Sequence, residues 1–149
     1  MVKSDFKFEL KKYETKDVSD GHINGSLVVI WRDWDKILQH TPKMVYVSSV
    51  NPNQIKGPHV HTRRNSYFVC LSGKVVFIIK KNDGTFEEII SSEHEPNIIY
   101  VPKMFPSAHI NLSKNISRIL VMADVSWKPN DNEMHNTLFE NYDWKKWKV

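Results

Sequence analysis

Cysteine and long apolar runs are both scarce in this sequence. Cys70 is the single cysteine among 149 residues. No disulfide can therefore form within the chain, and neither a zinc knuckle nor an iron–sulfur site can be built. Residues 1–10 alternate charged and apolar side chains and contain no apolar core of signal-peptide length. No later stretch approaches the roughly 18 apolar residues of a membrane span. The sequence therefore predicts a cytoplasmic protein that makes no use of a membrane.

The positive charge is modest and dispersed. The chain carries 21 Lys and Arg against 17 Asp and Glu, a formal net charge of +4, and the basic residues form no single tract. This balance favours anionic partners, and a phosphorylated small molecule fits it better than a nucleic acid, which we do not expect as a partner. The length predicts one domain over residues 1–149, with its core at about residues 43–125.

Short β-prone segments recur along the chain. Runs of four to eight residues rich in Val, Ile, Phe and Tyr are bounded by Gly, Pro, Asn, Asp or Ser, which is typical of an all-β sandwich or barrel. Residues 80–84 predict a hairpin because Asp-Gly tolerates the positive φ angles of tight turns, and Gly73 predicts a second turn. The expected strands cover residues 6–10, 25–31, 43–50, 59–61, 66–71, 74–80, 87–90, 97–101, 108–112 and 116–124.

Two further segments lie outside this pattern. A short helix is expected over residues 31–40, where Trp34, Ile37 and Leu38 share one face and Pro42 would end it. The C-terminal residues after 137 are rich in aromatic side chains. Leaving those rings in water would forgo a few kcal/mol of burial, so we expect this tail to pack back on the barrel.

Residues 56–73, KGPHVHTRRNSYFVCLSG, carry the most informative pattern. His59 and His61 are two residues apart, so on a strand both side chains point to the same face. On a barrel strand that face can be the interior. The two imidazoles would then share one cavity, although hydrogen-bonded structural histidines can have the same spacing.

The same stretch resembles the first cupin motif. His-x-His is followed, after eleven residues, by Gly73, and Val101-Pro102 with Asn111 resembles parts of the second motif. The resemblance implies a cupin fold, which is a double-stranded β-helix or jelly-roll barrel.

Metal-binding cupins have further ligands that this sequence lacks. Asn65 and Ser66 stand where those proteins carry a glutamate, and Ser107 stands where they carry a third histidine. His109 is the one spare candidate. Two histidines alone make a weak site, so we expect no metal and no cofactor. A metal-dependent cupin, such as an oxygenase or a sugar isomerase, remains an alternative.

Five segments carry a more specific resemblance, namely residues 25–31, 44–47, 56–59, 127–133 and 141–144. They resemble the dTDP-4-dehydrorhamnose 3,5-epimerase-like proteins among the cupins. The resemblance implies an isomerase that acts on a dTDP-linked 4-keto-6-deoxyhexose at C3, C5 or both. A base removes the proton next to the C4 ketone, an enolate forms, and an acid returns a proton from the opposite face. The resemblance also implies a nucleotide-diphosphate sugar as partner and a homodimer.

The resemblance assigns roles to individual residues. It places His59 at the family's base, a role that suits an imidazole with a pKa of about 6.5. His61, Lys56, Arg63 and Arg64 would stabilise enolate charge or bind the diphosphate.

The acid is harder to assign, because Trp127 stands where the family has its catalytic tyrosine. Ser66 stands near the position of the family's enolate-stabilising lysine. Tyr67 or Tyr46 is a candidate acid if its side chain faces the cavity. The predicted catalytic residues are His59, His61 and Tyr67. The predicted substrate-binding residues are Lys56, Arg63, Arg64, His109 and Trp127.

Two alternative functions remain open. Nucleotide-sugar 3,4-ketoisomerases show a similar Arg-Gly-x-His-x-His pattern at the same spacing to a Val-x-Cys-Leu-x-Gly segment, which residues 56–73 match. Proton movement between C3 and C4 would use both histidines. The second alternative is a cupin that binds a sugar nucleotide without turning it over, because the family's tyrosine and lysine are replaced.

Overall fold

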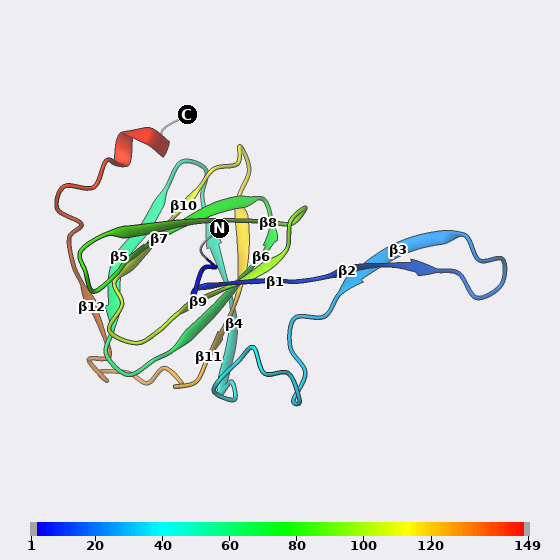
Figure 1. Ribbon diagram of the computed structural model, residues 1–149, viewed down its shortest axis with the longest axis horizontal. Helices are drawn as coiled ribbons and strands as arrows, with labels where there is room; N and C mark the ends of the chain where they lie inside the picture. Colours follow the sequence, from blue (N-terminus) through cyan, green and yellow to red (C-terminus); the bar gives the residue numbers. More distant parts are fainter. Residues whose placement is uncertain (1–2, 148–149) are drawn as a thin grey trace.

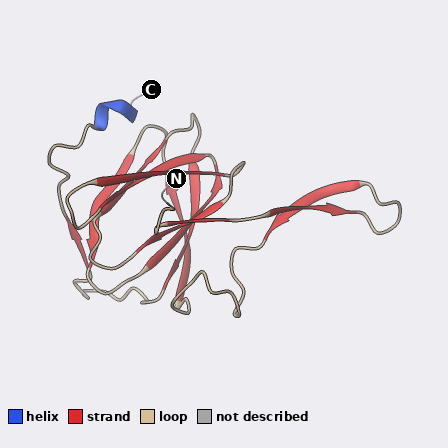
Figure 2. Cartoon of the chain, in the orientation of Figure 1, coloured by secondary structure: helices blue, strands red, loops and turns tan. Residues whose placement is uncertain are grey.

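The structure, a computed structural model, describes residues 3–147. Two five-stranded antiparallel sheets face each other as a barrel (Figure 1), in the orders β1-β9-β6-β11-β4 and β12-β5-β10-β7-β8. Strands and loops make up nearly all of this part of the chain (Figure 2), and the one helix described is the 3-10 turn η1 (Trp144–Trp147). None of residues 3–147 forms a helix long and apolar enough to cross a membrane. The predicted all-β cupin barrel is confirmed.

The strand bounds show how the sequence pattern became structure. Most predicted strands appear within a few residues of the expected positions, and β2 and β12 are additions. The strands are β1 (Lys7–Glu9), β2 (Lys12–Lys16), β3 (Ile23–Val28), β4 (Met44–Val50), β5 (Ile55–His61), β6 (Ser66–Ser72), β7 (Lys74–Lys80), β8 (Phe86–Ser92), β9 (Asn97–Val101), β10 (Ser107–Asn111), β11 (Ser117–Ala123) and β12 (Met134–Asn136).

Central strands bury side chains on both faces of their sheet, because successive side chains point to opposite faces. In β6, Phe68 and Cys70 pack between the two sheets, whereas Tyr67 and Val69 pack on the outer face. The buried residues between the sheets are Phe6, Val50, Cys70, Val75, Phe77, Ile79, Ile89, Ile99, Val101, Ile119 and Val121. Each large apolar side chain removed from water stabilises the barrel by about 1.5–3 kcal/mol.

The predicted turns between strands are confirmed. Gly73, with φ of +85°, joins β6 to β7, and Gly84, with φ of +86°, lies in the turn between β7 and β8. The backbone N–H of Gly84 donates to the carbonyl of Lys81 at 2.9 Å. Both turns need the left-handed conformation that glycine adopts at little cost.

The predicted helix over residues 31–40 is wrong, because this segment forms turns and bends. The Asp35 carboxylate accepts hydrogen bonds from the backbone N–H of Arg32 at 2.9 Å and from its guanidinium at 2.9 Å. These local bonds offer the backbone an alternative to a helix. Leu38 is buried against the outer face of the first sheet, whereas Trp34 stays exposed beneath Arg32. Tertiary packing therefore used only part of the predicted apolar face.

The C-terminal tail packs on the outer face of the second sheet, as predicted. Phe139 is 6% exposed and joins a buried cluster that includes Val76 and Ile78 of β7. The Tyr142 hydroxyl donates to Glu88 of β8 at 2.7 Å. Just before this tail, β12 adds to the edge of the sheet by pairing with β5.

Strands β2 and β3 form an arm that stands away from the barrel (Figure 1). Within residues 3–147 these two strands pair only with each other. Tyr13 lies opposite Leu27, and both side chains are exposed. The sequence pattern predicted a strand at residues 25–31 and missed β2, since neither strand has a buried face.

Candidate functional site

A cavity of about 180 Å³ lies between the two sheets. Strand β5 supplies Lys56, His59 and His61 to its wall, and β10 supplies Ser107 and His109. The opposite sheet contributes Tyr46 and Ser48 from β4 and Ser66 and Phe68 from β6. The spacing of two between the histidines therefore did bring both imidazoles to one interior face.

Position 57, within β5, requires glycine. Gly57 has φ of +92°, and a Cβ at this position would lie 2.7 Å from the carbonyl oxygen of Ser107. The backbone of β5 thus approaches β10 more closely than a side chain would allow. This approach brings Lys56 and His59 close to His109 at the cavity wall.

His61 forms a hydrogen bond with the carboxylate of Glu133. Its Nδ1 lies 2.6 Å from Glu133 Oε2, and Glu133 is 2% exposed. The other carboxylate oxygen accepts hydrogen bonds from the backbone N–H groups of Arg63 at 3.2 Å and Arg64 at 2.9 Å. The Arg64 Nε lies 3.8 Å from Oε2. A buried carboxylate with these partners is held in one orientation.

The protonation of this pair follows from its surroundings. Burial lowers the pKa of His61, and the hydrogen bond that its Nδ1–H donates to Glu133 raises the pKa without offsetting the burial. Burial alone would raise the pKa of Glu133, but the hydrogen bonds from His61 and the backbone hold the pKa below its ordinary value. The resting pair is a neutral imidazole beside an ionised carboxylate, which is the state a general base needs.

His59 has a weaker partner. Its Nδ1 lies 3.1 Å from the Oδ1 of Asn136, and this pair is more exposed than the pair of His61 and Glu133. An amide oxygen can only accept, so the Nδ1 of His59 donates. In both histidines the Nδ1 is therefore occupied and the Nε2 is left for a ligand.

Cationic and hydroxyl groups complete the wall. Arg64 is buried against Glu133, and the ammonium of Lys56 donates to the Ser48 hydroxyl at 2.8 Å. Burial raises the pKa of Tyr46, which keeps its phenol protonated near neutral pH. Tyr46 thus offers a proton-donating hydroxyl in the same cavity as the imidazoles.

His109 is held as a neutral imidazole. Its ring stacks on Phe77 with centroids 4.7 Å apart, and burial lowers its pKa to about 3. Among residues 3–147 its buried Nε2 has no hydrogen-bond partner. A buried polar atom of this kind costs about 1–3 kcal/mol unless a ligand or water satisfies it.

Three predicted site residues lie away from this cavity. Tyr67 points to the outer face of the first sheet, where its ring stacks on Tyr100 and its hydroxyl accepts a bond from the backbone of Gln39. Trp127 is 63% exposed, and Arg63 is exposed with its guanidinium directed to the carbonyl of Asp131. Ser66 and Phe68, the neighbours of Tyr67 on β6, line the cavity, and successive side chains on a strand point to opposite faces. This position does not fit Tyr67 as the acid.

Asn65, where metal-binding cupins carry glutamate, ties two loops together. Its side-chain amide donates to Asp124 at 2.8 Å, and its Oδ1 accepts from the backbone N–H of Lys103 at 3.0 Å and from the hydroxyl of Tyr100 at 3.3 Å. These contacts hold the loop that carries Arg64. The role of Asn65 is therefore structural.

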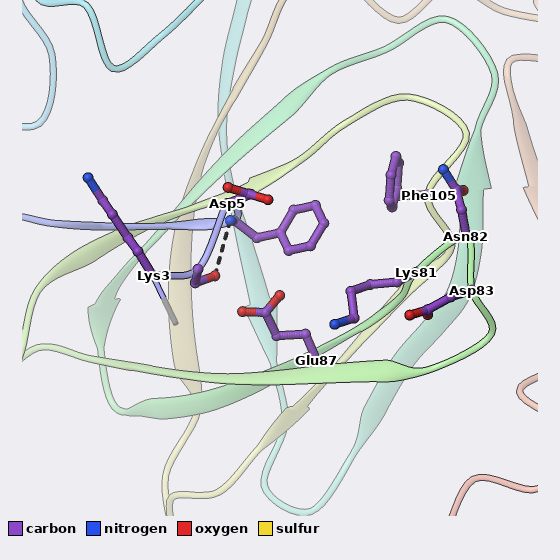
Figure 3. A pocket seen from close by; sticks show the side chains of 9 residues that line it. Lys3, Asp5, Lys81, Asn82, Asp83, Glu87 and Phe105 are labelled. Carbon is purple, nitrogen blue, oxygen red and sulfur yellow. Dashed lines mark hydrogen bonds between the residues drawn. The ribbon is translucent and has the colours of Figure 1, made fainter. Parts of the chain in front are cut away.

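A larger hollow of about 570 Å³ lies beside the N-terminal segment and the turn between β7 and β8 (Figure 3). Acidic and basic side chains such as Asp5, Lys81 and Glu87 surround it, with Phe6 and Phe105 packed together at 5.4 Å. It contains no histidine among its lining residues. The smaller cavity is the better candidate because it concentrates groups that can move a proton.

Glu133 and Asn136 were missed as site residues by sequence reasoning. They lie more than 70 residues after the histidines they contact. The resemblance covered residues 127–133, but only as a family ending. The available signal was the acidic residue in a polar stretch just before an aromatic tail, and spacing alone could not connect it to His61.

The fold and the histidine-lined cavity together define a cupin. A family model described as FdtA: WxcM-like, C-terminal matches residues 8–144. The chain belongs to this family, which agrees with the predicted resemblance to the sugar-nucleotide branch of cupins. Among curated proteins no match is found.

Solved structures share this fold. A dTDP sugar isomerase from Desulfovibrio desulfuricans G20 superposes with a TM-score of 0.79 at 12% identity, over 93% of this chain and 89% of that one. A 3,4-ketoisomerase from Helicobacter canadensis gives 0.66 at 19% identity, over 95% and 92%. The capsular polysaccharide assembling protein CapF from Staphylococcus aureus gives 0.61 at 20% identity, over 65% of this chain. The match spans only 29% of the CapF chain.

Proposed function

We propose that the protein is an isomerase that enolises a nucleotide-linked 4-keto-6-deoxyhexose, with dTDP as the nucleotide. The observation that carries this proposal is the pairing of a neutral His61 with the buried carboxylate of Glu133 inside a cavity that also holds His59. The names of structures with the same fold include a dTDP sugar isomerase and a 3'-monoepimerase. These names support the substrate class.

The chemistry requires a base, a stabiliser of negative charge and an acid. An imidazole takes the proton from the carbon next to the C4 ketone, and the electrons of that C–H bond move to the C4 oxygen. Lys56 and Arg64 place positive charge at the same wall, where it stabilises the enolate. Tyr46 or a protonated imidazole then returns a proton to carbon.

Epimerisation at C3, C5 or both is the function that we favour. It needs a proton delivered from the face opposite the base, and Tyr46 supplies the phenol hydroxyl of the cavity wall for this role. A 3,4-ketoisomerase is the second candidate. It is supported by the two imidazoles on one strand, because the proton would move between C3 and C4 on one side of the sugar.

Solvent exchange tests the proposal. A dTDP-4-keto-6-deoxyhexose is incubated with the protein in deuterated water, and hydrogen at C3 and C5 is followed by NMR. The wild-type protein and a His94→Asn control, which changes an exposed histidine outside the cavity, should exchange equally. His61→Asn should lower the rate by about 10²–10⁴.

The product then separates the two candidate functions. Exchange with inversion indicates an epimerase, and appearance of a 3-keto sugar indicates a ketoisomerase. Saturable binding without exchange in the wild-type protein would refute catalysis and favour a cupin that only binds its ligand.

We also propose that two copies form a dimer through the arm and the edge of the first sheet. Strand β4 is the last strand of that sheet, and its Val45 and Val47 are 58% and 53% exposed. The arm displays Tyr13 and Leu27 on one face. A two-stranded hairpin is marginal alone in water and an open edge needs cover, so a two-fold axis that lays each arm along the other copy's β4 satisfies both.

Light scattering after size exclusion tests the dimer. The wild-type protein should elute with the mass of two 17.5 kDa chains. Replacing Val45 and Val47 with Lys should shift it towards one chain, whereas replacing exposed Leu138 with Lys should not. A monomeric wild-type protein at micromolar concentration would refute this arrangement.

A further inference from the structure

Both site histidines take their Nδ1 partners from one short segment. Glu133 stands directly before β12 and contacts His61, and Asn136 ends β12 and contacts His59. The pairing of β12 with β5 places Met134 opposite His61 and Asn136 opposite His59. The segment from Glu133 to Asn136 therefore acts as a common support for the two imidazoles.

The partners are chemically unequal. The carboxylate of Glu133 is buried and its second oxygen is fixed by two backbone N–H groups. It can balance a positive charge on His61 at the moment that the imidazole takes a proton. The neutral amide of Asn136 orients His59 but brings no charge to balance an imidazolium.

Other charged and titratable groups face these imidazoles as well. Arg64 and His59 disfavour a proton on His61, and Glu133 favours one. Tyr46, Lys56 and His109 line the same cavity. Among the residues described around His61, Glu133 is therefore the one acidic side chain that raises its pKa, against the lowering caused by burial and by the nearby cations.

We infer that Glu133 is a positioning residue that makes His61 the base for the carbon-bound proton, and that Asn136 restricts His59 to orienting the substrate or relaying protons to solvent. The inference rests on the proposed enolisation. It also differs from the resemblance to the epimerase family, which placed the base at His59.

Titration by NMR tests the support without requiring activity. The ¹⁵N shifts of both imidazoles are followed with pH in the wild-type protein, in Glu133→Gln and in Asn136→Asp. Glu133→Gln keeps the shape and one acceptor oxygen, and it should lower the pKa of His61 while leaving His59 unchanged. Asn136→Asp should raise the pKa of His59. Glu140→Gln, which neutralises an exposed carboxylate, should change neither.

Solvent exchange into the sugar tests the catalytic assignment. Glu133→Gln should lower the maximal rate by about tenfold or more with little change in KM, as expected when the partner of a catalytic imidazole loses its charge. The exchange rate should be lower in His61→Asn than in His59→Asn.

The outcomes are distinct. A His61 titration unchanged by Glu133→Gln, or exchange that depends on His59 and survives His61→Asn, would overturn the inference. Absence of exchange in the wild-type protein would refute the proposed function instead, and the titrations would still decide whether Glu133 supports His61. If Glu133→Gln fails to fold, the shift of His59 in Asn136→Asp and the comparison of the two histidine variants carry the test.

Discussion

Removal of one buried ring should detach the C-terminal tail from the barrel. Phe139 is 6% exposed, it contacts Phe86 with ring centroids 5.0 Å apart, and it lies parallel to Trp144 at 5.9 Å. Phe139→Ala loses both the burial of the ring and the packing around it, which costs about 3–5 kcal/mol. At about 2–4 °C per kcal/mol for a chain of this length, the Tm should fall by about 6–20 °C.

Thermal unfolding followed by circular dichroism measures this loss, and urea unfolding supplies the free energy. The matched control is the neighbouring Leu138→Ala, because Leu138 is 77% exposed and its removal should change stability by no more than about 0.5 kcal/mol. Equal effects of the two variants would mean that Phe139 is not buried in solution. The packing of the tail on β7 and β8 would then be refuted.

Two further changes test residues of β5 and β10 at the cavity wall. Gly57→Ala should lower the Tm well below that of Gly84→Ala, because both glycines have positive φ but only the first would drive a Cβ to 2.7 Å from the Ser107 carbonyl; thermal unfolding of the two variants decides this. His109 has a pKa of about 3 in the folded protein against an ordinary 6.5. Its contribution to stability is complete above about pH 6.5 and is lost, by at most about 1.4 kcal/mol per pH unit, as the pH falls towards 3. Urea unfolding at pH 7 and 4.5 should therefore show a smaller loss for His109→Phe than for the wild type, and equal losses would refute the buried neutral state.

Local patterns in the sequence predicted much of the barrel and half of the site. The alternation of apolar residues reports a face buried against another sheet, so the central strands β6, β7 and β11 were found near their true bounds. Because residues two apart on a strand point to the same face, the sequence also predicted that His59 and His61 share one interior face. Asp83-Gly84 and Gly73 marked turns because positive φ angles are costly for other residues.

Local sequence patterns could not predict features that depend on the detailed contacts of side chains or on distant parts of the chain. Arg32 and Asp35 form a local turn that a helical periodicity does not reveal. Tyr67 and Tyr46 could not be distinguished until the faces of β4 and β6 were known. Glu133 became a site residue only because β12 pairs with β5, and three residues of strand leave no periodicity to read.

The dependence of the site on Glu133 and Asn136 sets an order of assembly during synthesis. All strands from β4 to β11, and both histidines, leave the ribosome before the segment that supports them. A nascent chain can therefore close most of its barrel while its imidazoles still lack fixed tautomers. The two imidazoles gain their Nδ1 partners only when this last segment pairs with β5, so a chain that ends before residue 133 would lack both partners.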